Sequence, residues 1–295
     1  MPQLRNKHCI KIICFAGGGI FGYSQAYFLN SLQTNVADHV DVMGGTSIGS
    51  CIALSLANGA TSQRIYNLFD IECAKIFNPS FISRLNPFGA LHNDKLLNEN
   101  YRKLMPKTLG ELNTYVVIPT LDFIQTRPKI YDNIVNYDDM DIPSWEIARM
   151  SSSAPTYFKP WAGHIDGGLF ENIPIHTTVS TILNKIPGAR MEDMCIFAIG
   201  TGRYDREPRT ENFSQWTAMQ WLKPMMGLLT ESNEMATVFW AKQMPFKYFK
   251  YYNPIMLNEN WHMDDPACLQ NIKAQCICNQ DIFLNTFMEF IDVRA

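Results

Sequence analysis

Hydrophobic positions fall into short runs that alternate with glycine turns and with stretches of helical spacing. Residues 10–16 form a β-branched and apolar run with Lys11 as its one charged residue, which is typical of a parallel strand buried on both faces. After a cluster of glycines, residues 23–32 carry apolar side chains at helical spacing, and residues 40–43 form a second apolar run. The chain is therefore predicted to begin as strand, helix, strand, the unit from which parallel sheets are built.

The same alternation continues toward the C-terminus. Further strands are predicted at residues 115–121, 129–131, 161–165, 194–199 and 248–252. Further helices are predicted at residues 50–58, 61–76, 141–149, 216–229 and 231–243. Residues 77–91 mix prolines and a glycine with aromatic side chains, and are predicted to form an irregular cap.

Neither a repeat nor a linker interrupts this pattern. Residues 1–295 are therefore predicted to form a single α/β domain, with its core at about residues 9–254 and a helical segment over residues 255–295.

Composition changes the picture in two ways. Charged residues make up 18% of the chain, while aromatic residues reach 12% and methionine occurs 15 times, a balance that indicates an apolar substrate or partner. The 25 basic and 28 acidic residues give a net charge of −3, without the basic excess that a nucleic-acid backbone requires. No nucleic acid is expected as a ligand.

The N-terminal sequence bears on the compartment. The first apolar run, residues 9–16, is too short for a membrane span and lacks the cleavage context of a signal peptide. The 8 cysteines are therefore expected to be reduced thiols. We expect a cytoplasmic protein that is peripheral at membranes, and the sequence leaves secretion without a cleaved signal open.

Ser47 is the strongest candidate nucleophile. It lies in Gly45-Thr46-Ser47-Ile48-Gly49, a G-x-S-x-G pattern between a predicted strand and a helix of small residues, which is the context of a nucleophile elbow. The turn needs Gly45 and Gly49 because the adjacent strand and helix leave no room for side chains. The helix N-terminus beneath the serine favours developing negative charge.

Asp166 is the preferred base for this serine. It ends a short predicted strand in an Asp166-Gly167-Gly168 turn, where a short carboxylate can stand clear of the backbone. His164 and His176 are the late histidine alternatives, and neither lies beside a recognisable supporting acid. Only two predicted strands precede the serine, whereas an α/β-hydrolase places several there, so the order argues against a Ser-His-Asp triad.

A glycine loop precedes the nucleophile in the chain. Residues 17–22 read Gly-Gly-Gly-Ile-Phe-Gly, and their N–H groups at the start of a helix form a receptor for negative charge. One interpretation is an oxyanion hole from Gly17, Gly18 and Gly19, with Gly22 supporting the loop. The other is a pyrophosphate site, because the string also fits G-x-G-x-x-G, but the acid expected after the second strand is missing.

Three other features have weaker interpretations. Four residues are suitable zinc ligands in spacings that match no usual finger or ribbon, so no metal is predicted: His262, Cys268, Cys276 and Cys278. Lysines and aromatic residues alternate over 242–252, which fits a membrane surface or ordinary packing. Methionines and tryptophans over 216–244 could line an acyl pocket, form a lid or belong to the core.

Four motifs, taken together in their order, resemble the patatin-like phospholipase family. They are residues 17–22, 45–49, 150–158 (Met-Ser-Ser-Ser-Ala-Pro-Thr-Tyr-Phe) and 166–168. The strand that ends in Gly-Thr-Gly at 200–202 and the segment 248–254 are also similar, so the resemblance covers about residues 9–254.

The resemblance implies a three-layer α/β/α sandwich with a central, mostly parallel sheet. It implies a Ser-Asp dyad with Ser47 as nucleophile and Asp166 as base, an oxyanion hole from the amides of residues 17–19, and hydrolysis of lipid acyl esters without a metal or other cofactor. The chain departs from the family at Phe21, where many relatives carry arginine or lysine.

The sequence thus predicts a lipid acyl hydrolase of the phospholipase A or lysophospholipase type. Its expected substrates are fatty acyl esters of glycerophospholipids, met in transient association with a membrane surface. The alternative is a lipid-binding or signalling module of the same fold, regulated by a partner or messenger, with little basal activity. A dinucleotide-binding enzyme comes third. The sequence leaves a regulatory ligand, the oligomeric state and the acyl position open.

Overall fold

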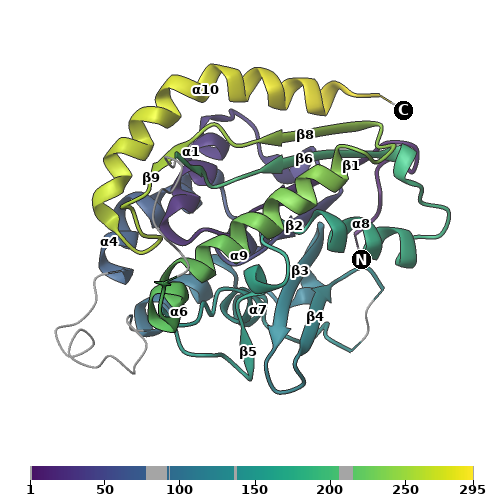
Figure 1. The fold of residues 1–295 in the computed structure, drawn as a ribbon. Coiled ribbons are helices and arrows are strands. Elements are labelled where there is room, and N and C mark those ends of the chain that lie inside the picture. The colour runs from purple at the N-terminus through teal and green to yellow at the C-terminus, as the bar shows by residue number, and fades with distance from the viewer. Residues whose placement is uncertain (1, 78–91, 93, 136–137, 206–214, 295) are drawn as a thin grey trace.

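The structure is a computed structural model of the chain, shown in Figure 1. It describes residues 2–77, 92, 94–135, 138–205 and 215–294. Beyond Phe77, the predicted irregular cap at 77–91 lies outside the described residues.

A seven-stranded sheet forms the centre of the described residues. Its order is β4-β3-β2-β1-β6-β8, with β5 beside β3. Neighbours from β3 through β8 run parallel, and β4 and β5 pair antiparallel with β3. The strands are β1 (Ile10–Phe15), β2 (Val42–Gly45), β3 (Tyr115–Asp122), β4 (Arg127–Asp132), β5 (His164–Ile165), β6 (Met194–Ile199) and β8 (Tyr248–Tyr252). A separate two-stranded sheet pairs β7 (Arg203–Asp205) with β9 (Met256–Asn258).

Helices cover both faces of the sheet (Figure 1). They are α1 (Tyr23–Ser31), α2 (Ile48–Ala57), α3 (Ser62–Asn67), α4 (Cys73–Ile76), α6 (Asp94–Leu104), α7 (Ser144–Ser151), α8 (Ile175–Lys185), α9 (Ala218–Ala241) and α10 (Leu269–Asp292). Because successive side chains of a strand point to opposite faces, β1 contributes to two cores. Ile13 and Phe15 pack with α1, α2 and α10, whereas Ile12 and Cys14 pack with α8 and α9. The predicted three-layer α/β/α sandwich is confirmed.

The structure differs from the predicted elements in three helical regions. One helix, α9, stands where two were predicted over 216–229 and 231–243. The hydroxyls of Thr230 and Ser232 donate to carbonyls of the preceding turn, so neither residue ends the helix. Residues 61–76 are interrupted by a π-helical turn, Leu68–Glu72. Helix α7 begins only after Pro143, later than the predicted start at residue 141.

The C-terminal helix α10 packs against the same core as β1 and β6. Its Phe283, Phe287 and Phe290 surround Phe197 of β6 at centroid distances of 6.0, 5.8 and 5.5 Å. Lys11 of β1 closes the end of α10, because its Nζ donates to the carbonyl of Phe290 at 2.6 Å. In the part of the chain that the structure describes, no helix combines the length and apolar character needed to cross a bilayer.

Candidate active site

Ser47 stands on a sharp turn between β2 and α2. Its backbone angles, φ 54° and ψ −123°, lie outside the regions that L residues favour. A Cβ on Gly45 would lie 2.3 Å from the carbonyl oxygen of Gly49, and one on Gly49 would lie 2.3 Å from that of Phe15. The G-x-S-x-G spacing therefore follows from the close approach of three backbone segments.

Side chains from distant segments hold this turn in place. The N–H of Ser47 donates to Ser151 Oγ at 3.1 Å, and Ser151 Oγ donates to the carbonyl of Pro119 at 2.8 Å. On the other side, Thr46 Oγ1 donates to the carbonyl of Glu171 at 2.8 Å. Sequence reasoning did not single out Ser151, whose only signal was its place in the motif at 150–158.

The predicted nucleophile and base lie together. Ser47 Oγ donates to Asp166 Oδ2 at 2.6 Å. The other carboxylate oxygen, Oδ1, accepts the N–H of Gly168 at 2.7 Å. The turn needs Gly167, because a Cβ there would lie 2.2 Å from the carbonyl oxygen of Pro119. Both carboxylate oxygens are thus engaged, and the one that faces the serine can accept its proton.

Burial tunes this carboxyl group. Asp166 is 6% exposed, and loss of solvent raises its pKa from 3.8 to about 6. The hydrogen bonds from Ser47 and Gly168 and the charge of Arg149 act in the opposite direction. The carboxylate therefore remains mostly ionised at neutral pH, with a pKa close enough to take up a proton during a reaction.

Arg149 supports the base from behind. Its buried guanidinium pairs with Asp94 at 2.8 Å and donates to Ser153 Oγ at 2.7 Å. The carbonyl of Ser153 in turn accepts the N–H of Asp166 at 3.1 Å. Sequence reasoning did not single out this arginine, because a charge inside an apolar helix face carries no local sign of its partners.

The glycine loop runs beside the serine, and its three amides differ. The N–H of Gly17 donates to the carbonyl of Asn172 at 2.9 Å, and the carbonyl of Gly17 accepts Thr201 Oγ1 at 2.8 Å. The Gly17 amide predicted for an oxyanion hole is therefore engaged with Asn172 in this structure, and its role in a reaction stays a prediction. Gly18 (φ 153°) and Gly19 (φ 56°) adopt backbone angles that favour glycine, and their N–H groups have no partner among the described residues.

Two more loop residues have packing roles. A Cβ on Gly22 would lie 2.8 Å from Ile48, so this glycine lets α2 start close to the loop. Phe21, the departure from the family pattern, is 3% exposed and packs edge-on against Tyr204. Its ring belongs to the core.

The alternative bases are engaged elsewhere. His164 Nε2 lies 3.2 Å from the hydroxyl of Tyr131, and His176 Nδ1 lies 3.3 Å from Glu171 with its ring against Trp240. The histidine and cysteines at 262–278 are not gathered, since the described residues hold no group of three or more His, Cys, Asp or Glu side chains that could bind a metal.

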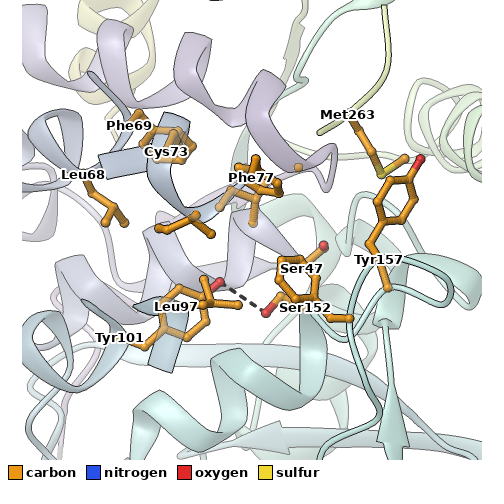
Figure 2. A pocket seen from close by; sticks show the side chains of 15 residues that line it. Ser47, Leu68, Phe69, Cys73, Phe77, Leu97, Tyr101, Ser152, Tyr157 and Met263 are labelled. Carbon is orange, nitrogen blue, oxygen red and sulfur yellow. Dashed lines mark hydrogen bonds between the residues drawn. The ribbon is translucent and has the colours of Figure 1, made fainter. Parts of the chain in front are cut away.

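An apolar pocket opens beside the serine. Figure 2 shows Ser47 between Tyr157 and Met263 on one side and Leu97 and Tyr101 on the other. The remaining lining comes mainly from the apolar segment 68–77 and from the end of the motif at 150–158. The lining is mostly apolar, and its hydroxyl groups belong to Ser47, Tyr101, Ser152 and Tyr157.

The methionine-rich segment 216–244 does not line this pocket with any of its described side chains. Helix α9 packs on the α8 side of the sheet, whereas the pocket lies on the α2 side. Met225 and Met235 of α9 are instead exposed. The segment 242–252 is accounted for by ordinary packing, because most of its aromatic residues belong to β8, which pairs with β6.

Comparison with known proteins shows which family the chain resembles. The family model described as patatin-like phospholipase matches residues 13–179. The cGAMP-activated phospholipase of Vibrio cholerae serotype O1 is 26% identical in an alignment 230 positions long, gaps included, that covers 66% of this chain and 65% of that protein. Patatin-17 of Solanum cardiophyllum is 21% identical in an alignment 312 positions long, gaps included, that covers 88% of this chain and 80% of that protein.

Among solved structures, VipD from Legionella pneumophila is 16% identical with a TM-score of 0.45, over 94% of this chain and 67% of that one. The alignment with the Vibrio relative covers 65% of that protein, so this chain spans slightly less than two thirds of its length.

Proposed function

The chain belongs to the patatin-like phospholipase family, and from this premise we propose that it is a serine esterase that cleaves fatty acyl esters of glycerophospholipids. The observation that carries the proposal is the 2.6 Å hydrogen bond from Ser47 Oγ to Asp166 Oδ2 at the mouth of an apolar pocket. A nucleophile with a neighbouring base is what covalent acyl transfer requires.

Acylation is the first half of the proposed reaction. Ser47 Oγ attacks the ester carbonyl carbon, and its proton passes to Asp166 as the new C–O bond forms. The carbonyl oxygen becomes an oxyanion, which the free N–H groups of Gly18 and Gly19 are suited to hold. The bond to the leaving alcohol then breaks, and the alcohol oxygen takes the proton back from Asp166, leaving an acyl-serine.

Deacylation repeats these steps with water. Asp166 takes a proton from water as the water oxygen bonds to the acyl carbon. When the bond to Ser47 breaks, its oxygen recovers that proton and the fatty acid leaves. Every step uses protein groups and water alone, so we expect turnover to be unchanged in EDTA.

Active-site labelling and product analysis test this proposal. A fluorophosphonate should label wild-type protein stoichiometrically at Ser47, and S47A should remain unlabelled while keeping its melting temperature. Mass spectrometry of products from a mixed-chain phospholipid should show free fatty acid and lysophospholipid with wild type only. Equal product from S47A would contradict the mechanism.

A second candidate is the regulated module with little basal activity, and one observation favours it. The Vibrio relative is a cGAMP-activated phospholipase by name. The same product assay with and without cGAMP distinguishes the two functions, because a regulated enzyme would be silent alone and active with the messenger. Equal turnover with and without cGAMP would favour an esterase that this messenger does not regulate.

A further inference from the structure

The turn that joins β3 to β4 exposes two large apolar side chains in succession. Phe123 is 64% exposed, and Ile124, at 79%, is the most exposed large apolar side chain among the described residues. Isolated exposed apolar residues are common on protein surfaces, but an adjacent pair at the tip of a hairpin needs a reason.

The position of this tip follows from the register of the sheet. Strands β1, β2 and β3 run parallel, so their carboxyl ends lie at one edge and lead to the glycine loop, to Ser47 and to the hairpin tip. Gly44 pairs with Val117 near the end of β2. β3 continues to Asp122, roughly 16 Å farther at about 3.3 Å per residue. The tip therefore projects beyond the edge that carries the serine.

The base belongs to the same edge. β5 pairs with the outer part of β3, with Leu121 opposite Ile165 and Asp122 opposite His164. Asp166 follows β5 directly. Figure 1 shows the β3–β4 hairpin projecting from the body of the molecule next to β5.

The tip is a built feature of the backbone. Asp122 Oδ1 accepts the N–H groups of Ile124 at 3.0 Å and Gln125 at 2.9 Å. The N–H of Phe123 donates to the carbonyl of Gly163 at 3.0 Å in the neighbouring turn. With these backbone groups satisfied, the two apolar side chains are held outward in an ordered turn.

Two exposed cations lie on the segments that lead to the tip. Arg127 begins β4 opposite Asp122, and Lys159 lies just before the neighbouring turn at 162–163. Neither has an ion-pair partner in the described part of the chain, whereas Lys129 is paired with Asp139 at 2.6 Å. Apolar side chains beside exposed cations fit the interface of a bilayer that contains anionic lipid.

We propose that this tip, Phe123 and Ile124 with Arg127 and Lys159, docks the protein on an anionic phospholipid bilayer with the edge that carries Ser47 toward the lipid. The inference rests on the proposed function for the identity of the substrate, whereas docking itself is measurable without turnover. The apolar pair would enter the interface while the two cations remain at the level of the phosphates.

Helix α9 supplies a matched control. Its Met235 and Phe239 are 72% and 70% exposed, an apolar pair of similar size on a helix that packs with α8. If exposed apolar area alone caused binding, replacing either pair would have the same effect.

The experiment measures cosedimentation with vesicles of phosphatidylcholine containing phosphatidylglycerol, with S47A in every protein so that the vesicles stay intact. We expect F123S/I124S to lower partitioning at least tenfold, since two large apolar side chains would no longer leave water on binding. M235S/F239S should stay within about twofold of the parent. R127Q/K159Q should lose the preference for anionic over pure phosphatidylcholine vesicles.

A second measurement does not depend on losing binding. F123W in the S47A parent should show a larger blue shift of fluorescence than the parent itself when vesicles are added, because the added indole would leave water. Docking at this tip is overturned by a blue shift in F123W no larger than in the parent, by wild-type partitioning of F123S/I124S, by loss of binding in M235S/F239S alone, or by a parent that does not bind vesicles.

Failure of the proposed function has a different signature. F123S/I124S with Ser47 intact should hydrolyse a soluble short-chain ester at the wild-type rate. The same variant should lose hydrolysis of phospholipid vesicles. Wild-type protein that binds vesicles through the tip but hydrolyses no ester would contradict the proposed esterase function. The docking proposal would still hold.

Discussion

At the residue scale, two residues of the site have features that lower the free energy of unfolding. Ser47 has a positive φ, and Asp166 keeps a carboxylate in a buried position. Such strain is commonly concentrated at functional sites, where the surrounding structure enforces it. Here the Ser47 N–H donates a hydrogen bond to Ser151, and Asp166 accepts one from the Gly168 N–H. These two hydrogen bonds hold the residues in place.

D166N should lose activity and gain stability. An amide cannot accept the serine proton, so we expect kcat to fall at least 10³-fold. The folded pKa of about 6 exceeds 3.8, so the contribution of Asp166 to stability is full below about pH 4 and is lost as the pH rises through about 6. Asparagine has no charge to bury, so D166N avoids that loss. Its free energy of unfolding at pH 8 should be about 1–3 kcal/mol higher than that of wild type.

The measurement is urea unfolding at pH 8 beside the esterase assay, with D281N, an exposed carboxylate on α10, as the control. Normal activity in D166N, or a clear loss of stability, would contradict this account of the buried carboxylate.

The pH dependence of turnover belongs to the same residue. Because Asp166 must be ionised to act as base, and its pKa lies near about 6, kcat/KM should rise tenfold per pH unit below that value and level off above it. A soluble ester measured from pH 4.5 to 8.5 gives the profile. A level profile across pH 5–7 would mean that another group is the base.

At the element scale, the elbow depends on how closely β1, β2 and α2 approach. G49A places a Cβ 2.3 Å from the carbonyl oxygen of Phe15, a backbone atom that cannot rotate away. We expect destabilisation of about 3 kcal/mol or more. The midpoint of urea unfolding tests this.

G110A is the matched control for that substitution. Its Cβ would lie 3.1 Å from Met140 Cβ and 3.3 Å from the carbonyl oxygen of Met140, so the neighbour has to move far less than at Gly49. We expect a change below about 1 kcal/mol. Equal unfolding midpoints for G49A and wild type would show that the elbow can open without cost.

At the scale of the whole molecule, the first strand and the last helix are joined. Lys11 Nζ donates to the carbonyls of Phe290 and Val293 at 2.6 and 2.7 Å, groups that the end of a helix leaves unsatisfied. Its ammonium also lies 5.2 Å from the centroid of the Phe290 ring. One buried lysine thus fixes α10 on the sheet, far along the chain from its own position.

K11M should test this link. Methionine keeps the apolar stem but lacks the donors, so we expect a loss of about 1–3 kcal/mol and faster hydrogen exchange at the end of α10. K250M, which removes an exposed lysine of β8, should change neither. Exchange that rises equally in both variants would show that Lys11 does not hold the helix.

Features that depend on neighbouring residues could be predicted from the sequence. The apolar run at 10–16 predicted a buried strand, and alternation with helical spacing predicted the layered fold, because burial on both faces leaves a continuous pattern. The glycines around Ser47 and after Asp166 marked two tight turns, because crowding by adjacent backbone is a local steric demand.

The folded molecule set the features that depend on residues far apart in the chain. It brought Ser47 to Asp166, gave the Gly17 amide to Asn172 and left those of Gly18 and Gly19 without a described partner. It also buried Arg149 behind the base. The physical reason is that a donor's partner and a side chain's exposure are set by the packing of distant segments, which local periodicity does not encode.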